Sequence, residues 1–267
     1  MIAIRHLTKV FGKSQVEALA LAAQGASKAN IMAKTGATLA LRDVSLDIPA
    51  GGVFVLMGLS GSGKSSLLRH LNRLIEPSAG EISIDGQDIR ALDVKGLRDF
   101  RRRQVSMVFQ GFGLMPHLSV QDNVAFGMMA RGDDKALARA KAAEWIHTVG
   151  LDGFEKARPS ALSGGMKQRV GLARALATDT GIVLMDEAFS ALDPMTRADM
   201  QDLLLALQKR LSKTIVFVTH DLSEATLIGD TVAMMKEGEV VQVGAPDDIL
   251  NHPVDDYVAR FVEVHKR

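Results

Sequence analysis

The chain has 267 residues, of which 47% are hydrophobic, so it can bury a substantial core. Its formal net charge of +1 provides no field for gripping nucleic acid, and the absence of cysteine excludes disulfides and thiolate metal sites. No apolar run approaches the roughly 18 residues that span a bilayer, and the N-terminus lacks a signal-peptide pattern. We therefore expect the chain to stay in the cytosol.

The N-terminal part predicts antiparallel strands. Residues 2–11 and 39–48 have strand patterns, and a third strand at 81–84 leads into a turn at 85–86. Residues 15–24 and 27–36, between the first two strands, predict two short helices, the second capped by Ser27.

This helical insert interrupts what should be a plain connection between strands. Lys28 and Lys34 are its only side chains suited to phosphate, and neither lies in a run of glycines. We therefore expect the insert to serve subunit contact or regulation rather than hydrolysis.

A glycine-rich loop follows the next strand. Residues 53–57 are apolar and predict a buried strand, the sequence GLSGSGKS occupies 58–65, and residues 65–73 predict a helix. The G-x-x-x-x-G-K-S spacing lets backbone N–H groups converge on a phosphate. Lys64 would reach the β- and γ-phosphates of a nucleotide, and Ser65 would ligate Mg²⁺. A turn that binds nothing is the alternative, which the flanking strand and helix weaken.

Helices dominate the middle of the chain. The strand predicted at 105–109 ends at Gln110, and helices at 120–130 and 135–149 should form a separate subdomain. The basic run at 101–103 is interpreted as a solvated helix end.

The sequence Ser163-Gly164-Gly165 begins a further predicted helix. A serine hydroxyl and two bare glycine amides at a helix N-terminus form an anion site. For an isolated S-G-G, an ordinary serine cap is the better interpretation. Because the phosphate loop already supplies one anion site, two such sites fit a head-to-tail pair of chains.

Two strand ends carry polar residues. The apolar run 182–185 predicts a central parallel strand that ends in Asp186 and Glu187. Asp186 would hold Mg²⁺ through water, and Glu187 would act on the attacking water beside the γ-phosphate. Alone, the acidic pair could equally cap a helix.

Residues 215–219 predict another strand, which ends at His220. A short strand pair at 238–244 and terminal helices at 247–250 and 256–264 follow.

A phosphate loop followed by LSGGMKQR at 162–169 and a carboxylate-tipped strand resembles the ATPase subunits of ABC transporters. The resemblance implies an α/β P-loop NTPase fold of the ABC ATPase type. Its mixed core sheet would carry an antiparallel β subdomain and a helical subdomain. It also implies ATP and Mg²⁺ as cofactors, with each ATP held between one chain's phosphate loop and the Ser163 helix of a second chain.

The resemblance also assigns roles to single residues. Gln110 would contact Mg²⁺ and sense the membrane partner, His220 would touch the γ-phosphate, Asp193 would face the dimer interface, and Phe11 would stack on adenine. A lone Gln or His is usually structural, and a Phe is more often core, so the order and spacing of the motifs carry these assignments. The predicted catalytic set is Glu187, His220 and Gln110; the ATP-binding set is Phe11, Gly58, Ser60, Gly61, Ser62, Gly63, Lys64, Ser65 and Ser66; the set acting from the second chain is Ser163, Gly164, Gly165 and Asp193; the metal set is Ser65, Gln110 and Asp186.

We expect a single ABC ATPase domain over residues 1–267. Gln110 and the segment 112–115 should form part of a docking groove for the permease, because we expect its apolar side chains to be exposed beside two possible hinges, Gly111 and Gly113. Ordinary core packing is the alternative for that segment. The expected divisions are a nucleotide-binding core at 1–110 and 160–245, the insert at 15–38, a helical subdomain at 111–160 and C-terminal helices at 246–267.

The insert and several further segments resemble the glycine betaine/proline group of osmoprotectant importers, for example LNRLIEP at 71–77 and MDEAFSALDP at 185–194. This implies an ATPase homodimer at the cytoplasmic face of the inner membrane, with separate permease subunits and, indirectly, a periplasmic solute-binding protein. The solute would be glycine betaine, choline or proline betaine. An importer of polar amino acids is the alternative, and a non-transport ABC ATPase is a more distant one. Many members of the group continue into regulatory CBS domains; this sequence stops at Arg267, so we expect that module to be absent or truncated.

Overall fold

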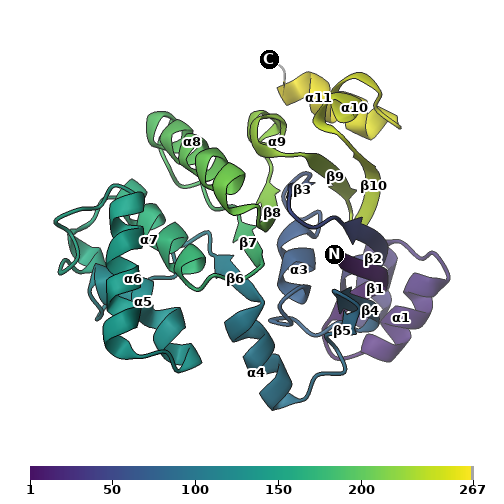
Figure 1. Ribbon diagram of the computed structural model, residues 1–267. Coiled ribbons are helices and arrows are strands. Elements are labelled where there is room, and N and C mark those ends of the chain that lie inside the picture. The colour runs from purple at the N-terminus through teal and green to yellow at the C-terminus, as the bar shows by residue number, and fades with distance from the viewer. Residues whose placement is uncertain (266–267) are drawn as a thin grey trace. The chain divides into compact units, whose positions relative to one another are not determined.

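The computed structural model describes residues 1–265 and divides into two compact units. Unit 1 comprises residues 1–93 and 218–267, and unit 2 comprises residues 94–217. Figure 1 shows the elements of both units, coloured along the chain. No helix within the described residues is both long and apolar enough to cross a membrane.

Unit 1 contains an antiparallel sheet with the strand order β2-β1-β4-β5. Ile2 of the central strand β1 faces Ile48 on one side and Ile84 on the other, and all three side chains are buried. The three strands predicted from the sequence are therefore confirmed. The bounds are Ile2–Phe11 for β1, Thr38–Ile48 for β2, Ala79–Ile84 for β4 and Gln87–Asp88 for β5.

The insert forms the two predicted helices, α1 (Gln15–Ala23) and α2 (Lys28–Thr35). The Ser27 hydroxyl accepts a hydrogen bond from the Asn30 amide, and α2 ends at Gly36 in the left-handed conformation with φ 66°. Buried residues of the helices pack with residues of β1 and β2 in one apolar cluster, so the insert covers part of this sheet: Ala18, Ala22 and Ile31 with Val10, Ala37 and Leu39.

The remaining strands pair both in parallel and antiparallel, as expected for the mixed sheet that the sequence predicts. In unit 1, β3 runs parallel to β9, and β9 runs antiparallel to β10. In unit 2, β6 runs parallel to β7. Every residue of β3, β7 and β8 is buried, which is typical of central strands. The bounds are Val53–Met57 for β3, Val105–Val108 for β6, Ile182–Asp186 for β7, Thr214–Thr219 for β8, Thr231–Lys236 for β9 and Glu239–Gly244 for β10.

Helix α3 (Lys64–His70) is shorter than the sequence predicts. The backbone of Arg73 has a left-handed φ of 52°, which a continuing helix cannot accommodate. The Asn72 side chain accepts a hydrogen bond from the Leu74 amide at 3.1 Å and stabilises the turn there. The other helices of unit 1 are α9 (Leu222–Ile228), α10 (Pro246–Asn251) and α11 (Asp256–His265).

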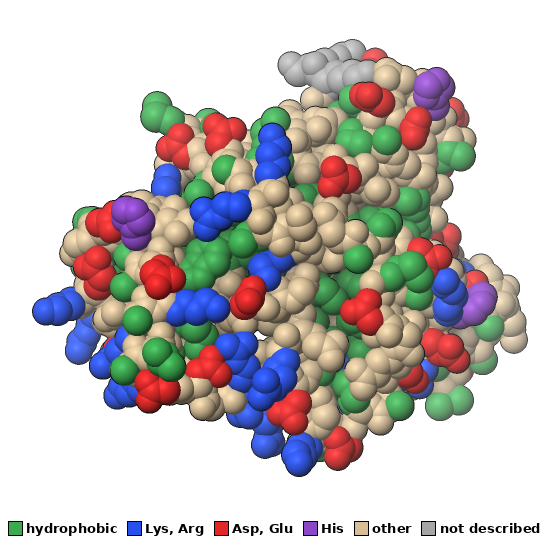
Figure 2. Space-filling view, in the orientation of Figure 1, with side chains coloured by type: hydrophobic (Ala, Val, Ile, Leu, Met, Phe, Trp, Pro, Cys, Tyr) green, Lys and Arg blue, Asp and Glu red, His purple; other side chains and the backbone are tan. Residues whose placement is uncertain are grey.

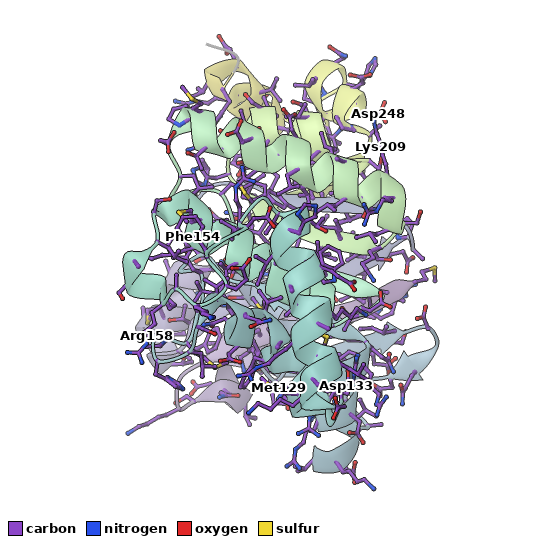
Figure 3. The ribbon with its side chains drawn as sticks, turned by 60° about the vertical axis from the view of Figure 1, so that its left-hand side comes forward. Met129, Asp133, Phe154, Arg158, Lys209 and Asp248 are labelled. Atoms are coloured by element: carbon purple, nitrogen blue, oxygen red, sulfur yellow. The ribbon has the colours of Figure 1, made fainter. Side chains whose placement is uncertain are left out.

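Unit 2 is mainly helical. Helices α5, α6 and α7 enclose an apolar core that includes Val124, Ala142 and Val170. Figure 3 labels Met129 and Asp133, where α5 ends and the turn toward α6 begins. Arg131 pairs with Asp133 and donates to the carbonyl of Thr178 at 2.7 Å, so this turn is tied to the end of α7. The helices are α4 (Val94–Arg103), α5 (Val120–Arg131), α6 (Lys135–Thr148), α7 (Gly164–Ala177) and α8 (Pro194–Leu211).

The basic run at 101–103 forms the last turn of α4, with Arg101 and Arg103 exposed. Figure 2 shows Lys and Arg side chains gathered at the lower edge of the view, over the region of α4 in Figure 1. The interpretation as a solvated helix end is confirmed.

Candidate nucleotide site

The glycine-rich loop 58–63 connects β3 to α3 and closes tightly on its neighbours. Gly58 and Gly63 have φ values of 145° and 104°. A Cβ on Gly58 would lie 2.2 Å from the Met235 carbonyl oxygen, and one on Gly63 would lie 2.9 Å from that of Ala40. Side chains at these two positions would therefore push the loop away from the sheets that support it.

Lys64 is only 4% exposed, and its ammonium is held by the loop itself. Its Nζ donates to the carbonyls of Gly58 at 2.8 Å and Leu59 at 3.0 Å. A cation buried this deeply is suited to an anionic ligand that replaces or adds to these carbonyl contacts.

Four serines of the loop and the start of α3 could donate hydrogen bonds to an oxygen-rich ligand. Ser62 is buried, and its hydroxyl has no hydrogen-bond partner within residues 1–265. Ser60 is exposed at the tip of the loop, and Ser65 and Ser66 are half-buried in the first turn of α3. A triphosphate with its metal ion offers acceptors for these hydroxyls.

A pocket of about 720 Å³ opens beside the loop, a volume within the range of small-molecule sites. Residues 59–62 of the loop form one wall, and Ser27, Lys28 and Ala29 of the insert form another. Burial lowers the pKa of the Lys28 ammonium, and the carboxylate of Glu237 opposes that shift. No pattern in the sequence indicates that the insert borders the phosphate loop. The rest of the lining is Lys236, Glu237 and Tyr257.

Phe11 ends β1 and keeps 40% of its surface exposed, so it is not a core residue. The Lys9 ammonium lies over its ring, 4.8 Å from the ring centre. An exposed aromatic ring in unit 1 is available for stacking, which fits the predicted adenine contact.

Asp186 and Glu187 lie in unit 2, and Glu187 has an unusual backbone conformation. Asp186 is buried at the end of β7, and Glu187 has a left-handed φ of 45°. Both the amide and the hydroxyl of Ser190 donate to the Glu187 carbonyl, which fixes this turn. Gln110 Nε2 donates to Glu187 Oε2 at 2.9 Å. A strained, half-buried carboxylate with a positioned amide partner is typical of a functional site.

The helix-cap alternative for this acidic pair is excluded. The helix that follows is α8, and its N-cap is Asp193, which accepts from the Thr196 amide at 3.0 Å. Hydrogen bonds from Thr196 hold the pKa of Asp193 below its usual range. Asp193 therefore has a structural task, and its predicted place at a dimer interface stays a prediction.

The S-G-G sequence has a partly structural explanation. The Ser163 hydroxyl caps α7 by accepting from the Met166 amide at 3.3 Å. A Cβ on Gly165 would lie 2.4 Å from Thr196 Cγ2, so the close approach of α8 requires glycine there. Gly164 is exposed and has no such contact, since its added Cβ would meet its nearest neighbours at 4.0 Å. The absence of a side chain at Gly164 is therefore the part of the motif that local packing leaves unexplained.

The predicted metal residues Ser65, Gln110 and Asp186 include only one carboxylate. Within the described residues, no cluster of three or more His, Cys, Asp or Glu could hold an ion. Mg²⁺ is usually bound through one or two carboxylates together with substrate phosphates and water, so no such cluster is required, and the assignment of Ser65, Gln110 and Asp186 stays a prediction. Gln110 and Asp186 belong to unit 2, whereas Ser65 and the exposed His220 belong to unit 1.

The segment 112–115 is less exposed than we expected. Leu114 packs against the helical core of unit 2, and the other apolar residues of the segment are half-buried. The Asn123 side chain exchanges hydrogen bonds with the backbone of Met115, and Arg174 donates to two carbonyls of the segment. The apolar side chains here are half-buried rather than fully exposed, and permease docking at this segment stays a prediction.

Comparison with known proteins gives a consistent result. The family model described as "ABC transporter" matches residues 41–190. The glycine betaine/carnitine transport ATP-binding protein GbuA of Listeria monocytogenes is 52% identical over 98% of this chain and 66% of its own length. The glycine betaine/proline betaine transport system ATP-binding protein ProV of Escherichia coli is 54% identical over 97% of this chain and 64% of its own length.

This chain thus spans slightly less than two thirds of those two relatives. Among solved structures, the dimeric ATP-binding cassette MJ0796 bound to ADP and Pi matches with a TM-score of 0.78 and 32% identity. The match covers 92% of this chain and 99% of that cassette.

Proposed function

This chain belongs to the ABC transporter family, and we propose that it is the ATP-hydrolysing subunit of an importer for quaternary amine osmoprotectants. The observation that carries hydrolysis is Glu187, a half-buried carboxylate at the end of β7 that receives a hydrogen bond from Gln110. The family match and the phosphate loop support ATP as the substrate.

The phosphate loop binds the triphosphate. Backbone amides of the loop and the Lys64 ammonium, already held among loop carbonyls, neutralise the β- and γ-phosphate charge. Ser65 and Asp186 would hold Mg²⁺, which would supply positive charge against the phosphates. Phe11 stacks on the base.

Glu187 accepts a proton from the attacking water or orients that water. The hydrogen bond from Gln110 fixes the direction of the carboxylate, and the turn closed by Ser190 fixes its backbone. His220 acts at the γ-phosphate. Such positioning of a general base contributes roughly 10²–10⁴ in rate.

Two chains act together. Ser163, Gly164 and Gly165 of one chain complete the nucleotide site of the other, and Asp193 lies at the interface between them. The dimeric cassette MJ0796 supports a pair as the working unit. The pair docks on separate permease subunits at the cytoplasmic face of the membrane, and a solute-binding protein delivers the solute from outside.

The names of the two relatives support glycine betaine or proline betaine as the solute. Uptake by proteoliposomes that contain the subunit and its permease, with the solute-binding protein supplied outside, tests this proposal. We expect ATP-dependent uptake of glycine betaine that excess proline betaine or choline suppresses and excess histidine does not. ATP-dependent uptake of a polar amino acid instead would contradict the proposed solute, and activity without any membrane partner would contradict the transport role.

A further inference from the structure

Lys9 and Phe11 lie two residues apart on β1 and form a cation–π pair. Lys9 Nζ lies over the aromatic ring, 4.8 Å from its centre. The lysine is 9% exposed, whereas the phenylalanine is 40% exposed. The ammonium therefore covers one face of a ring that still offers much of its surface to a ligand.

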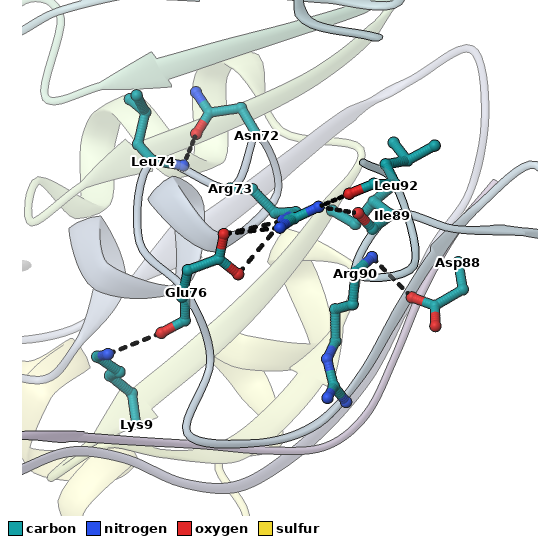
Figure 4. A network of polar contacts seen from close by, with 9 residues as sticks. All are labelled: Lys9, Asn72, Arg73, Leu74, Glu76, Asp88, Ile89, Arg90 and Leu92. Atoms are coloured by element: carbon teal, nitrogen blue, oxygen red, sulfur yellow. Dashed lines mark hydrogen bonds and ion pairs between the residues drawn. The ribbon is translucent and has the colours of Figure 1, made fainter. Parts of the chain in front are cut away.

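A network of hydrogen bonds fixes this ammonium, as Figure 4 shows. Lys9 Nζ donates to the Glu76 carbonyl at 2.7 Å. Arg73 Nε and Nη2 donate hydrogen bonds to the carboxylate of Glu76. Arg73 Nη1 donates to the carbonyls of Ile89 and Leu92, each at 2.8 Å. The backbone that holds the lysine is thus itself braced against the end of the antiparallel sheet.

Burial disfavours the charged form of the Lys9 side chain. Burial lowers the pKa of Lys9, an effect that Glu76 opposes, and burial also lowers the pKa of the nearby His70. A partly desolvated ammonium gains more from an aromatic face than a solvated one does. The ring and the ammonium therefore hold each other in place.

We propose that Lys9 is a positioning residue for the base of the bound nucleotide and acts through Phe11. This inference rests on the proposed function, in which Phe11 stacks on adenine. The ammonium fixes the ring by one face and leaves the other face for the purine. It also draws electron density from that ring, which favours stacking with an electron-rich base.

The test compares two ligands, one with a base and one without. We expect Lys9→Met to weaken MgATP binding roughly three- to tenfold, as measured by calorimetric titration. Binding of magnesium tripolyphosphate, which has no base, should not change. Lys9→Arg keeps a cation that can cover the ring and should restore most of the ATP affinity. An equal loss for both ligands would overturn the inference, since it would indicate general damage to the phosphate loop.

A double-mutant cycle separates this inference from the proposed base contact. Phe11→Ala should weaken ATP binding, and adding Lys9→Met to it should weaken binding no further. If Phe11→Ala has no effect, the base contact in the proposed function is wrong. If Phe11→Ala weakens binding while Lys9→Met does not, only the role of Lys9 is wrong. Should Lys9→Met fail to fold, Lys9→Gln, which retains a donor for the Glu76 carbonyl, takes its place in both experiments.

Discussion

The Gln110 amide donates to the Glu187 carboxylate at 2.9 Å, although the two residues stand 77 positions apart in the chain. The backbone of Glu187 has a left-handed φ of 45°. In a residue with a side chain, this conformation is unfavourable by about 1–3 kcal/mol. The turn would relax unless its surroundings held it, and Ser190 does so through two hydrogen bonds to the Glu187 carbonyl. Strain kept at a carboxylate is consistent with its proposed catalytic role.

Replacing Glu187 by Gln should separate ATP binding from hydrolysis. Glutamine can keep the hydrogen bond to Gln110 but cannot act as a base. We expect turnover to fall roughly 10²–10⁴-fold, about 3–5 kcal/mol of barrier, with ATP affinity unchanged. Steady-state phosphate release and nucleotide titration measure the two quantities. Glu144→Gln on the exposed face of α6 is the matched control. Normal turnover in the Glu187 variant would refute the assignment.

The two half-sites should complement each other between chains. Ser163→Arg damages one half-site and Lys64→Ala the other, and Lys64→Ala should also abolish ATP binding to its own loop. Each variant alone should be inactive. A mixture contains heterodimers with one intact site, so part of the ATPase activity should return if one site suffices. Continued inactivity of a demonstrated heterodimer would contradict either the trans arrangement or that one-site condition.

Gly165 and Gly164 should respond differently to alanine. An added Cβ at Gly165 would collide with Thr196 Cγ2 at 2.4 Å, and we expect a loss of about 1–3 kcal/mol of stability. Thr196→Ser removes that methyl group and should restore the melting temperature of Gly165→Ala. Gly164→Ala should melt like the wild type yet lower the ATPase activity of the dimer. A stable Gly165→Ala protein would show that the close approach of the two helices is not limiting.

Lys28 should affect nucleotide binding, whereas Lys34 on the same helix should not. Lys28 lines the pocket beside the phosphate loop, and Lys34 does not. Removing one charge–phosphate contact costs about 1–2 kcal/mol, so Lys28→Met should bind ATP roughly five- to thirtyfold more weakly. Lys34→Met serves as the matched control. Equal affinities for both variants and the wild type would contradict a role of Lys28 in nucleotide binding and would favour a role of the insert in subunit contact or regulation alone.

Deletion of residues 14–38 is expected to destabilise the protein, which makes it a poor test of what the insert does. Ile31 and Ala18 of the insert are fully buried against Val10 and Leu39 of the sheet. Replacing the insert by a short Gly-Ser turn would expose these strand residues to water. At roughly 25 cal/mol per Å² of apolar surface, that exposure would cost several kcal/mol, so single substitutions test the insert more cleanly.

The local features of this protein followed from the sequence by itself. Strand alternation, apolar runs and capping residues depend on neighbours within a few positions, and so β1, the Ser27 and Ser163 caps and the phosphate loop were predicted close to where they lie. The order of the motifs along the chain pointed to the family for the same reason, because it requires no knowledge of contacts.

Tertiary structure decided what distant residues do to one another. Three contacts depend on how elements pack, which no local pattern encodes. They are the hydrogen bond between Gln110 and Glu187, the position of Lys28 in the pocket lining and the packing of Leu114 against the helical core. Helix α3 ends before Arg73, which has a left-handed backbone and donates to the carbonyls of Ile89 and Leu92, contacts that no local pattern predicts. The same bonds fix the carbonyl that holds Lys9 over Phe11, because a long charged side chain has a defined position only where the fold supplies both its acceptor and its aromatic partner.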